Sequence, residues 1–265
     1  MPARPFLFAS LLVAGVAAFA APASSPSTAR FKIVETSHQV VDLSAFSQPE
    51  QVSHIVKSTF VTVTSSDSAG GRAVKVVIDS VRADSVDSPQ PIPPAIFDSL
   101  RGAAATGWIG PDGKLTLATD TTSRGAAAGM QVRALFPQMR PRAKVGDHWT
   151  DTTEVNGSGN GLMANAVTRR ITNWAVTAEQ TVNGVKARKF DAAFSQSMTG
   201  EMAGPQGSMS IDGTGTGTAT YFLASDDRLV GAQSTLTLQV SVTVPQAAEP
   251  IPVNATITSV VTSIR

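Results

Sequence analysis

Long runs of alternating apolar and polar residues fill the second half of this sequence, and they restrict its fold more than any other feature. The runs span residues 149–155, 163–182, 185–198, 208–223, 229–244 and 253–264. In the fifth run, Leu236, Leu238 and Val240 are separated by polar residues, which predicts a strand with one buried and one solvent-facing side. The series of runs predicts a long antiparallel meander, curved enough to wrap around something.

Short turn sequences separate these runs. Asn156-Gly157 and Asn183-Gly184 favour the tight turns of hairpins, because both residue types accept positive φ angles. A loop is expected at 203–207, and Asp226 and Asp227 are expected in a solvated turn. The turns therefore predict that consecutive strands pair as hairpins.

The first half of the chain mixes shorter strand-like runs with two helical segments. Strands are expected at 31–34, 39–43, 51–65 and 73–81, with a turn at 67–72 and a short hairpin at 107–118. One helix is expected at 95–101, where Pro94 occupies its first turn. A second is expected at 121–136, with Ser123 as its N-cap and Pro137 as its stop.

The stretch 135–153 connects this second helix to the strand-rich half. Pro137 and Pro141 lie at the helix exit, Gly146 and Asp147 form a tight turn, and Trp149 begins a strand. We interpret the stretch as a structural hinge and expect Trp149 to be a core residue.

These patterns predict a mainly β fold, in which a curved antiparallel sheet carries one or two short helices packed on it. The sheet is expected to be a half-barrel or an open barrel meander. Residues 31–265 are expected to form a single domain, with helices in 31–136 and the meander in 137–265. Residues 24–30, rich in Ser, Pro and Ala, are expected to be a disordered linker.

The first 23 residues have the pattern of a secretory signal peptide. Arg4 precedes an apolar run at 6–20, and small residues allow cleavage after Ala20 or Ala23. No later run is apolar enough for a transmembrane span. We therefore expect an exported, periplasmic or secreted protein of the bacterial cell envelope. It would not be lipid-anchored at an N-terminal cysteine, because the sequence has no cysteine.

Charge and residue types argue against several function classes. The formal net charge is +1, and Arg4 is the only charged residue before Ser24, so the remainder is close to neutral. Such a balance gives no basis for binding nucleic acid or an anionic membrane surface. No sequence pattern indicates a cofactor.

No arrangement typical of a catalytic or metal site stands out. Asp147 and His148 are adjacent on an extended segment and would point to opposite faces, so Asp147 is expected to bond its own turn instead. His38, His54 and His148 lack metal-ligand spacing. Alternating glycines at 213–217 precede no helix and indicate a bend, or the close approach of a helix or ligand. We therefore predict no catalytic residues, no metal and no enzyme.

Three short motifs resemble those of a family of exported bacterial proteins known only as a domain of unknown function. The first combines a helix, an F-P exit and V-G-D-x-W, and it is carried by Phe136, Pro137, Val145, Gly146, Asp147 and Trp149. The second is a Gly-rich strand that leads through Tyr221-Phe222 to the acidic turn at 226–229, and the third is the hairpin sequence at 108–115. The resemblance implies a curved sheet with helices against its concave face, similar to the half-barrel of periplasmic lipoprotein carriers.

The functional expectation is a non-enzymatic envelope protein that binds a lipid or another apolar ligand between sheet and helix. The candidate ligand-binding residues are Met130, Leu135, Phe136, Trp149 and Tyr221. One alternative is a structural or protein-interaction module whose concave face is filled by its own side chains. A hydrolase is the third alternative, and the absence of a nucleophile–base pattern argues against it.

Overall fold

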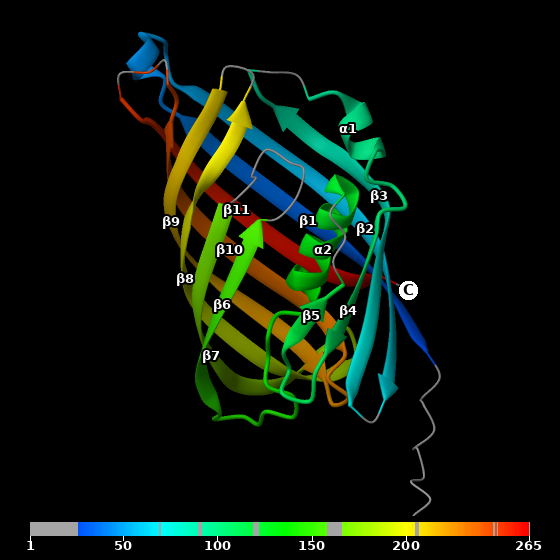
Figure 1. Ribbon diagram of the computed structural model, residues 1–265. Coiled ribbons are helices and arrows are strands. Elements are labelled where there is room, and N and C mark those ends of the chain that lie inside the picture. The colour runs from blue at the N-terminus through cyan, green and yellow to red at the C-terminus, as the bar shows by residue number, and fades with distance from the viewer. Residues whose placement is uncertain are drawn as a thin grey trace, which may run out of the picture.

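The computed structural model describes residues 26–68, 70–89, 92–118, 122–157, 166–204, 207–245, 247 and 249–264 (Figure 1). The strands are β1 (Ser27–Val41), β2 (Gln51–Ser68), β3 (Gly71–Asp87), β4 (Ala104–Ile109), β5 (Leu115–Leu117), β6 (His148–Gly157), β7 (Ala166–Val182), β8 (Val185–Gly204), β9 (Gly207–Ala224), β10 (Leu229–Thr243) and β11 (Ile251–Ile264). The helices are α1 (Pro94–Asp98), α2 (Ser123–Leu135) and the short 3-10 turn η1 (Ser44–Phe46).

These strands form one antiparallel sheet in the order β5-β4-β3-β2-β1-β11-β10-β9-β8-β7-β6. β1 pairs with both β2 and β11, so the last strand of the chain joins its two halves into a single sheet. The sheet is open, because β5 and β6 are its edges and do not pair with each other. The expected fold class, a mainly β curved meander with short helices, is confirmed.

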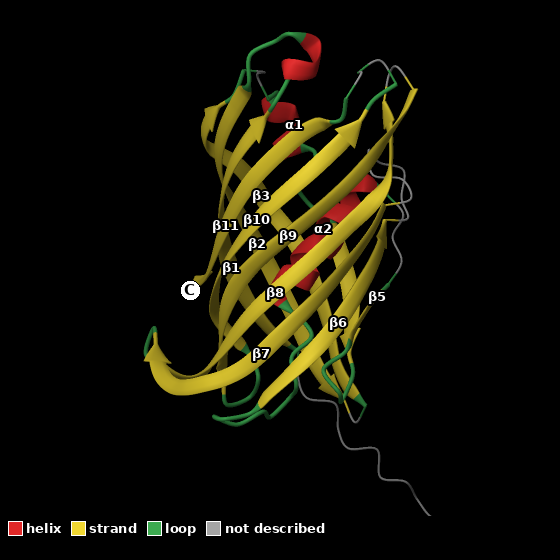
Figure 2. Cartoon of the chain, turned by 90° about the vertical axis from the view of Figure 1, so that its left-hand side faces the viewer, coloured by secondary structure: helices red, strands yellow, loops and turns green. Residues whose placement is uncertain are grey.

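The sheet has a concave face, which we define as the side that packs against α2. The helix contacts β3 and β4, and Figure 2 shows it lying inside the curve of the strands. Because side chains alternate along a strand, residues that pair across strands share a face. Phe31, Val61 and Val261 are buried with the helix residues Val132 and Leu135, and their paired rows identify the concave face.

The hydrophobic core lies where α2 covers this face. Phe190, Val61, Val76 and Val132 are completely buried there. Trp149 stacks on Trp174 with ring centroids 5.9 Å apart. Trp149 is only 9% exposed, so the prediction that it is a core residue is confirmed.

Several predicted boundaries change. β1 begins at Ser27, inside the stretch 24–30 that was expected to be a linker, because its first residues pair with the far end of β2. The N-cap of α2 is Thr122 rather than Ser123, since Thr122 Oγ1 accepts a hydrogen bond from the Gly125 amide at 3.0 Å. The turn expected at Asn156-Gly157 is wrong, because both residues pair with β7.

Other predicted turns are confirmed. Asn183 and Gly184 have φ angles of 50° and 77° and connect β7 to β8. Gly146 has a φ of 97° in the turn before β6, a conformation that favours glycine. The expected signal peptide at 1–23 lies outside the described residues. Within the described ranges, no helix has the length and apolar character needed to cross a bilayer.

Candidate functional site

The contact between α2 and the sheet, where a ligand was expected, is filled by side chains of the protein itself. Ala128 and Val132 are completely buried and Leu135 is 1% exposed. Trp149 belongs to the same buried cluster, and Phe136 packs against it. Four of the five predicted ligand-binding residues therefore contribute to, or pack against, one core.

Met130 is the exception, because its side chain is 64% exposed on α2 and does not contribute to the core. Tyr221 packs against the core and tilts toward Trp174 with ring centroids 5.8 Å apart. Burial raises the pKa of the Tyr221 phenol to about 12, so the group is neutral at physiological pH. Apart from Met130, the predicted ligand-binding residues are therefore part of the packed core or contact it.

A second region of the concave face lies beyond α2, and we call it the open half. It consists of the inward-facing residues of 35–41, 51–57, 166–170, 194–200, 211–217, 234–242 and 251–259. In Figure 1, β1, β10 and β11 continue to the upper left, away from the helix. We call the remainder of the concave face, which contains the core, the covered half.

Apolar side chains run along the centre of the open half, and we call them the apolar strip. They are Leu236, Leu238, Val240 and Val242 of β10 and Ile251, Val253 and Ile257 of β11. They share the face of the core residues Ala232 and Val261, with which they are in register. All are partly exposed and none belongs to the buried core cluster.

Glycines of β9 let neighbouring side chains lie across that strand. A Cβ added at Gly217 would lie 2.5 Å from Phe194 Cζ, and one added at Gly215 would lie 2.6 Å from Leu238 Cδ2. Those positions therefore have no room for a side chain, because neighbours on β8 and β10 already occupy the space. The groups that approach 213–217 are therefore side chains and backbone of the adjacent strands, and not the helix or ligand that the sequence predicted.

Arg170 places a positive charge in the open half, which the sequence patterns did not predict. Its Nε and Nη2 donate hydrogen bonds to Gln196 Oε1, at 3.1 and 2.6 Å. Its guanidinium carbon lies 4.4 Å from the centroid of the Phe194 ring. Sequence alone gives two adjacent arginines in a strand, and only the strand register shows that Arg170 is the one that faces inward.

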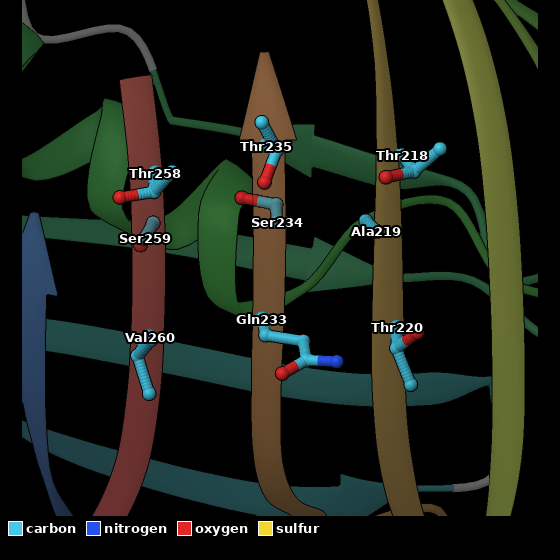
Figure 3. A pocket seen from close by; sticks show the side chains of 9 residues that line it. All are labelled: Thr218, Ala219, Thr220, Gln233, Ser234, Thr235, Thr258, Ser259 and Val260. Atoms are coloured by element: carbon cyan, nitrogen blue, oxygen red, sulfur yellow. The ribbon is translucent and has the colours of Figure 1, made fainter. Parts of the chain in front are cut away.

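The hollows that the structure shows on the sheet lie on its convex face. The first has a volume of about 270 Å³ (Figure 3). The residues that line it include the outward-facing Thr218, Thr220, Gln233, Thr235 and Thr258. A second hollow of about 200 Å³ lies along the same strands, near Asp212 and Asn254. Both are shallow. The first is lined mainly by hydroxyl and amide groups, and the second has one carboxylate, that of Asp212, so neither combines several titratable groups as an active site does.

The pair Asp147-His148 serves the hinge and has no catalytic geometry. Asp147 Oδ2 accepts a hydrogen bond from the Lys144 amide at 2.8 Å, as expected for a residue that stabilises its own turn. Two further backbone hydrogen bonds join this turn to Val176 of β7. His148 is exposed, and its Nδ1 lies 3.5 Å from the Gly146 carbonyl oxygen.

His38 and His54, which are distant in sequence, face each other on β1 and β2. Their ring centroids are 6.3 Å apart. Among the residues that the structure describes, however, no group of three or more His, Asp or Glu side chains is arranged to hold a metal ion.

The turn between β9 and β10 is more constrained than expected. Arg188 forms an ion pair with Asp227 and also donates to the Ala143 carbonyl of the hinge. Arg72 donates to the backbone oxygens of Asp226 and Asp227, at 2.9 and 3.3 Å. The expectation of a solvated turn is therefore wrong for Asp227, because the turn connects the hinge to the β2–β3 hairpin.

A scan of the sequence against protein-family models finds no match, and a search of curated proteins finds no significant match. The resemblance to a family of exported proteins of unknown function therefore stays a prediction.

Proposed function

We propose that this protein is a non-enzymatic, exported cell-envelope protein that binds an apolar ligand on the open half of its concave face. The observation that carries the proposal is the partial exposure of the apolar strip on β10 and β11. Contiguous apolar side chains on a concave surface are typical of ligand-binding sites. The ligand would lie beyond α2, because the helix–sheet contact is already filled.

Export is supported by the signal-like pattern at 1–23. The non-enzymatic part is supported by the site itself. Besides its apolar residues, the open half holds hydroxyl residues such as Ser37, Ser234 and Ser259, one arginine, and one ion pair between Glu35 and Lys57 at 2.6 Å. No hydrogen bond among the described residues joins these hydroxyls to a carboxylate or histidine that could act as a base.

The first experiment is native mass spectrometry of the protein purified from a bacterial envelope, followed by solvent extraction and lipid analysis. A stoichiometric apolar molecule that co-purifies would support the proposal. The apo protein should also take up added fatty acid or phospholipid. A mass without ligand, together with no uptake of either lipid, would overturn the proposal.

A pair of variants locates the binding surface. Leu238→Asn places an amide in the apolar strip, whereas Gln239→Asn changes the next residue, which faces outward on the convex side. The affinity for the added lipid should fall about fivefold or more for Leu238→Asn, since burying an unpaired amide against an acyl chain costs roughly 1–3 kcal/mol. It should be unchanged for Gln239→Asn.

The alternative is a structural or protein-interaction module. The observation that favours it is the completely packed contact between α2 and the sheet. This alternative predicts that the apolar strip takes up no small molecule. Wild-type protein and Leu238→Asn should then both give native mass spectra without bound ligand.

A further inference from the structure

Arg170 is held in a defined position on the concave face. Two of its guanidinium nitrogens share one acceptor, Gln196 Oε1, and its plane lies against Phe194. Such contacts restrict a long side chain that would otherwise sample many rotamers. The remaining guanidinium nitrogen, Nη1, has no hydrogen-bond partner among the described residues.

The charge of Arg170 is not balanced by the groups that surround it. No carboxylate of the described residues forms an ion pair with it. Asp151 on the adjacent β6 also faces inward, but its Oδ1 accepts from the Thr152 amide. Lys57 already neutralises Glu35, the inward-facing acid of the open half.

Burial gives this unpaired charge a chemical consequence. Desolvation lowers the pKa of the Arg170 guanidinium, yet an arginine remains protonated at neutral pH. A desolvated cation on a partly apolar surface is unfavourable until an anion pairs with it. A guanidinium with free N–H donors is well suited to a carboxylate or a phosphate, which it can bind in a planar, charge-assisted geometry.

The strand register connects Arg170 to the apolar strip. Arg170 pairs with Gln196, which pairs with Gly215, which pairs with Leu238. All four positions lie in one row across β7 to β10. Three strand spacings separate the ends of this row, a distance of about 14 Å. A Cβ added at Gly215 would lie 2.6 Å from Leu238 Cδ2 and 3.3 Å from Gln196 Cγ, so the apolar strip and the hydrogen-bond acceptor of Arg170 meet over this glycine.

We propose that Arg170 binds the anionic head group of an amphipathic ligand whose hydrocarbon chain lies on the apolar strip. This inference rests on the proposed function and specifies its ligand class, a long-chain anion with a carboxylate or phosphate head. A fatty acid and a phosphate monoester share this chemistry, and the experiment separates them.

The test measures affinity for three ligands that have the same alkyl chain, namely dodecanoate, dodecyl phosphate and dodecanol, below their aggregation concentrations. It compares the full protein with Arg170→Met, which keeps the apolar stem and removes the charge. Arg169→Met is the matched control, because Arg169 is the preceding residue, is exposed and faces outward. Circular dichroism and a thermal unfolding curve verify that each variant is folded.

The wild-type protein should bind at least one of the two anions about tenfold or more tightly than dodecanol, as expected for a charge-assisted pair. The preferred anion identifies the head group. Arg170→Met should lose this preference while it retains its affinity for dodecanol, and Arg169→Met should keep it. Arg170→Lys, which retains the charge but not the planar fork, should show an intermediate preference.

Two outcomes distinguish the failures. If the wild-type protein binds all three ligands equally, or if Arg170→Met keeps the preference for the anion, the role of Arg170 is wrong and the proposed apolar site stands. If the wild-type protein binds none of the three, the proposed function fails, and the role of Arg170 fails with it.

Discussion

The covered and open halves of the concave face are built from the same strands, yet they differ in what packs against them. In the covered half, inward-facing residues meet α2 and the tryptophans of β6 and β7, and they are almost completely buried. In the open half, the apolar strip has the same alternation and remains partly exposed. Strand patterning therefore determines which face is apolar, whereas a separate element decides whether that face becomes core.

The difference has an energetic meaning. Burial of apolar surface contributes roughly 25 cal/mol per Å² to the stability of the folded state. The apolar side chains of the covered half already make this contribution, because other residues of the protein bury them. The apolar strip of the open half remains partly exposed, so a bound ligand could bury it and add stability. The comparison is tested by measuring the free energy of unfolding of variants with a substitution in one half or the other, with and without ligand.

The largest effect is expected in the covered half, for Trp149→Ala. The side chain is 9% exposed, stacks on Trp174 and meets the edge of Phe190. Its removal should lower the free energy of unfolding by about 3–5 kcal/mol. Urea unfolding monitored by circular dichroism measures this loss.

Trp108→Ala is the control for that substitution, because this tryptophan is 38% exposed on β4. It should cost less than Trp149→Ala, about 2 kcal/mol, in line with a partly solvated side chain. Equal losses in the free energy of unfolding at the two positions would show that burial in the core beside α2 does not make a tryptophan more stabilising. That result would contradict the proposed difference between the two halves.

An intermediate effect is expected at the end of the covered half, where Asp227 ties three segments together. Asp227→Ala leaves Arg188 without its partner at a site where the arginine side chain is 13% exposed. The free energy of unfolding should fall by about 2 kcal/mol, since an unpaired, partly buried charge is unfavourable.

Asp226→Ala is the matched change one residue earlier. Asp226 is exposed, its Oδ1 accepts a hydrogen bond from the Arg228 amide at 3.2 Å, and it makes a long ion pair with the Arg228 side chain at 3.7 Å. Its loss should stay within about 0.5 kcal/mol. Thermal unfolding of both variants in low and high salt checks the assignment, and a salt-independent, equal effect would contradict it.

The sequence predicted the sheet well, because period-two alternation and turn residues are local signals. The pattern at 229–244 and the turn at Asn183-Gly184 are examples that the structure confirms. It did not predict that β11 pairs with β1, since that contact joins segments more than 200 residues apart, as their numbering shows. Neither strand pattern contains information about such a distant partner.

The site was predicted less well, for a related reason. Leu135 and Trp149 are apolar residues beside a helix exit, and the same pattern is typical of a ligand site and of a packed core. Arg170 and the ion pair of Arg188 with Asp227 depend on register and on contacts between distant turns. No local pattern marks which of two adjacent arginines faces inward.

A small stability effect is expected in the open half, and the same substitution, Leu to Ala, can be compared in both halves. Leu135→Ala removes a side chain that is 1% exposed, and it should cost about 2–5 kcal/mol. Leu238→Ala removes identical atoms from a partly exposed position and should cost about 1 kcal/mol without ligand.

With saturating dodecanoate, the wild-type protein should gain stability, because a ligand that binds only the folded state stabilises it by mass action. Leu238→Ala should gain less, so the difference between the two proteins should widen when ligand is added. If the cost of Leu238→Ala equals that of Leu135→Ala and does not change with ligand, the apolar strip is core, and the two halves of the concave face are equivalent.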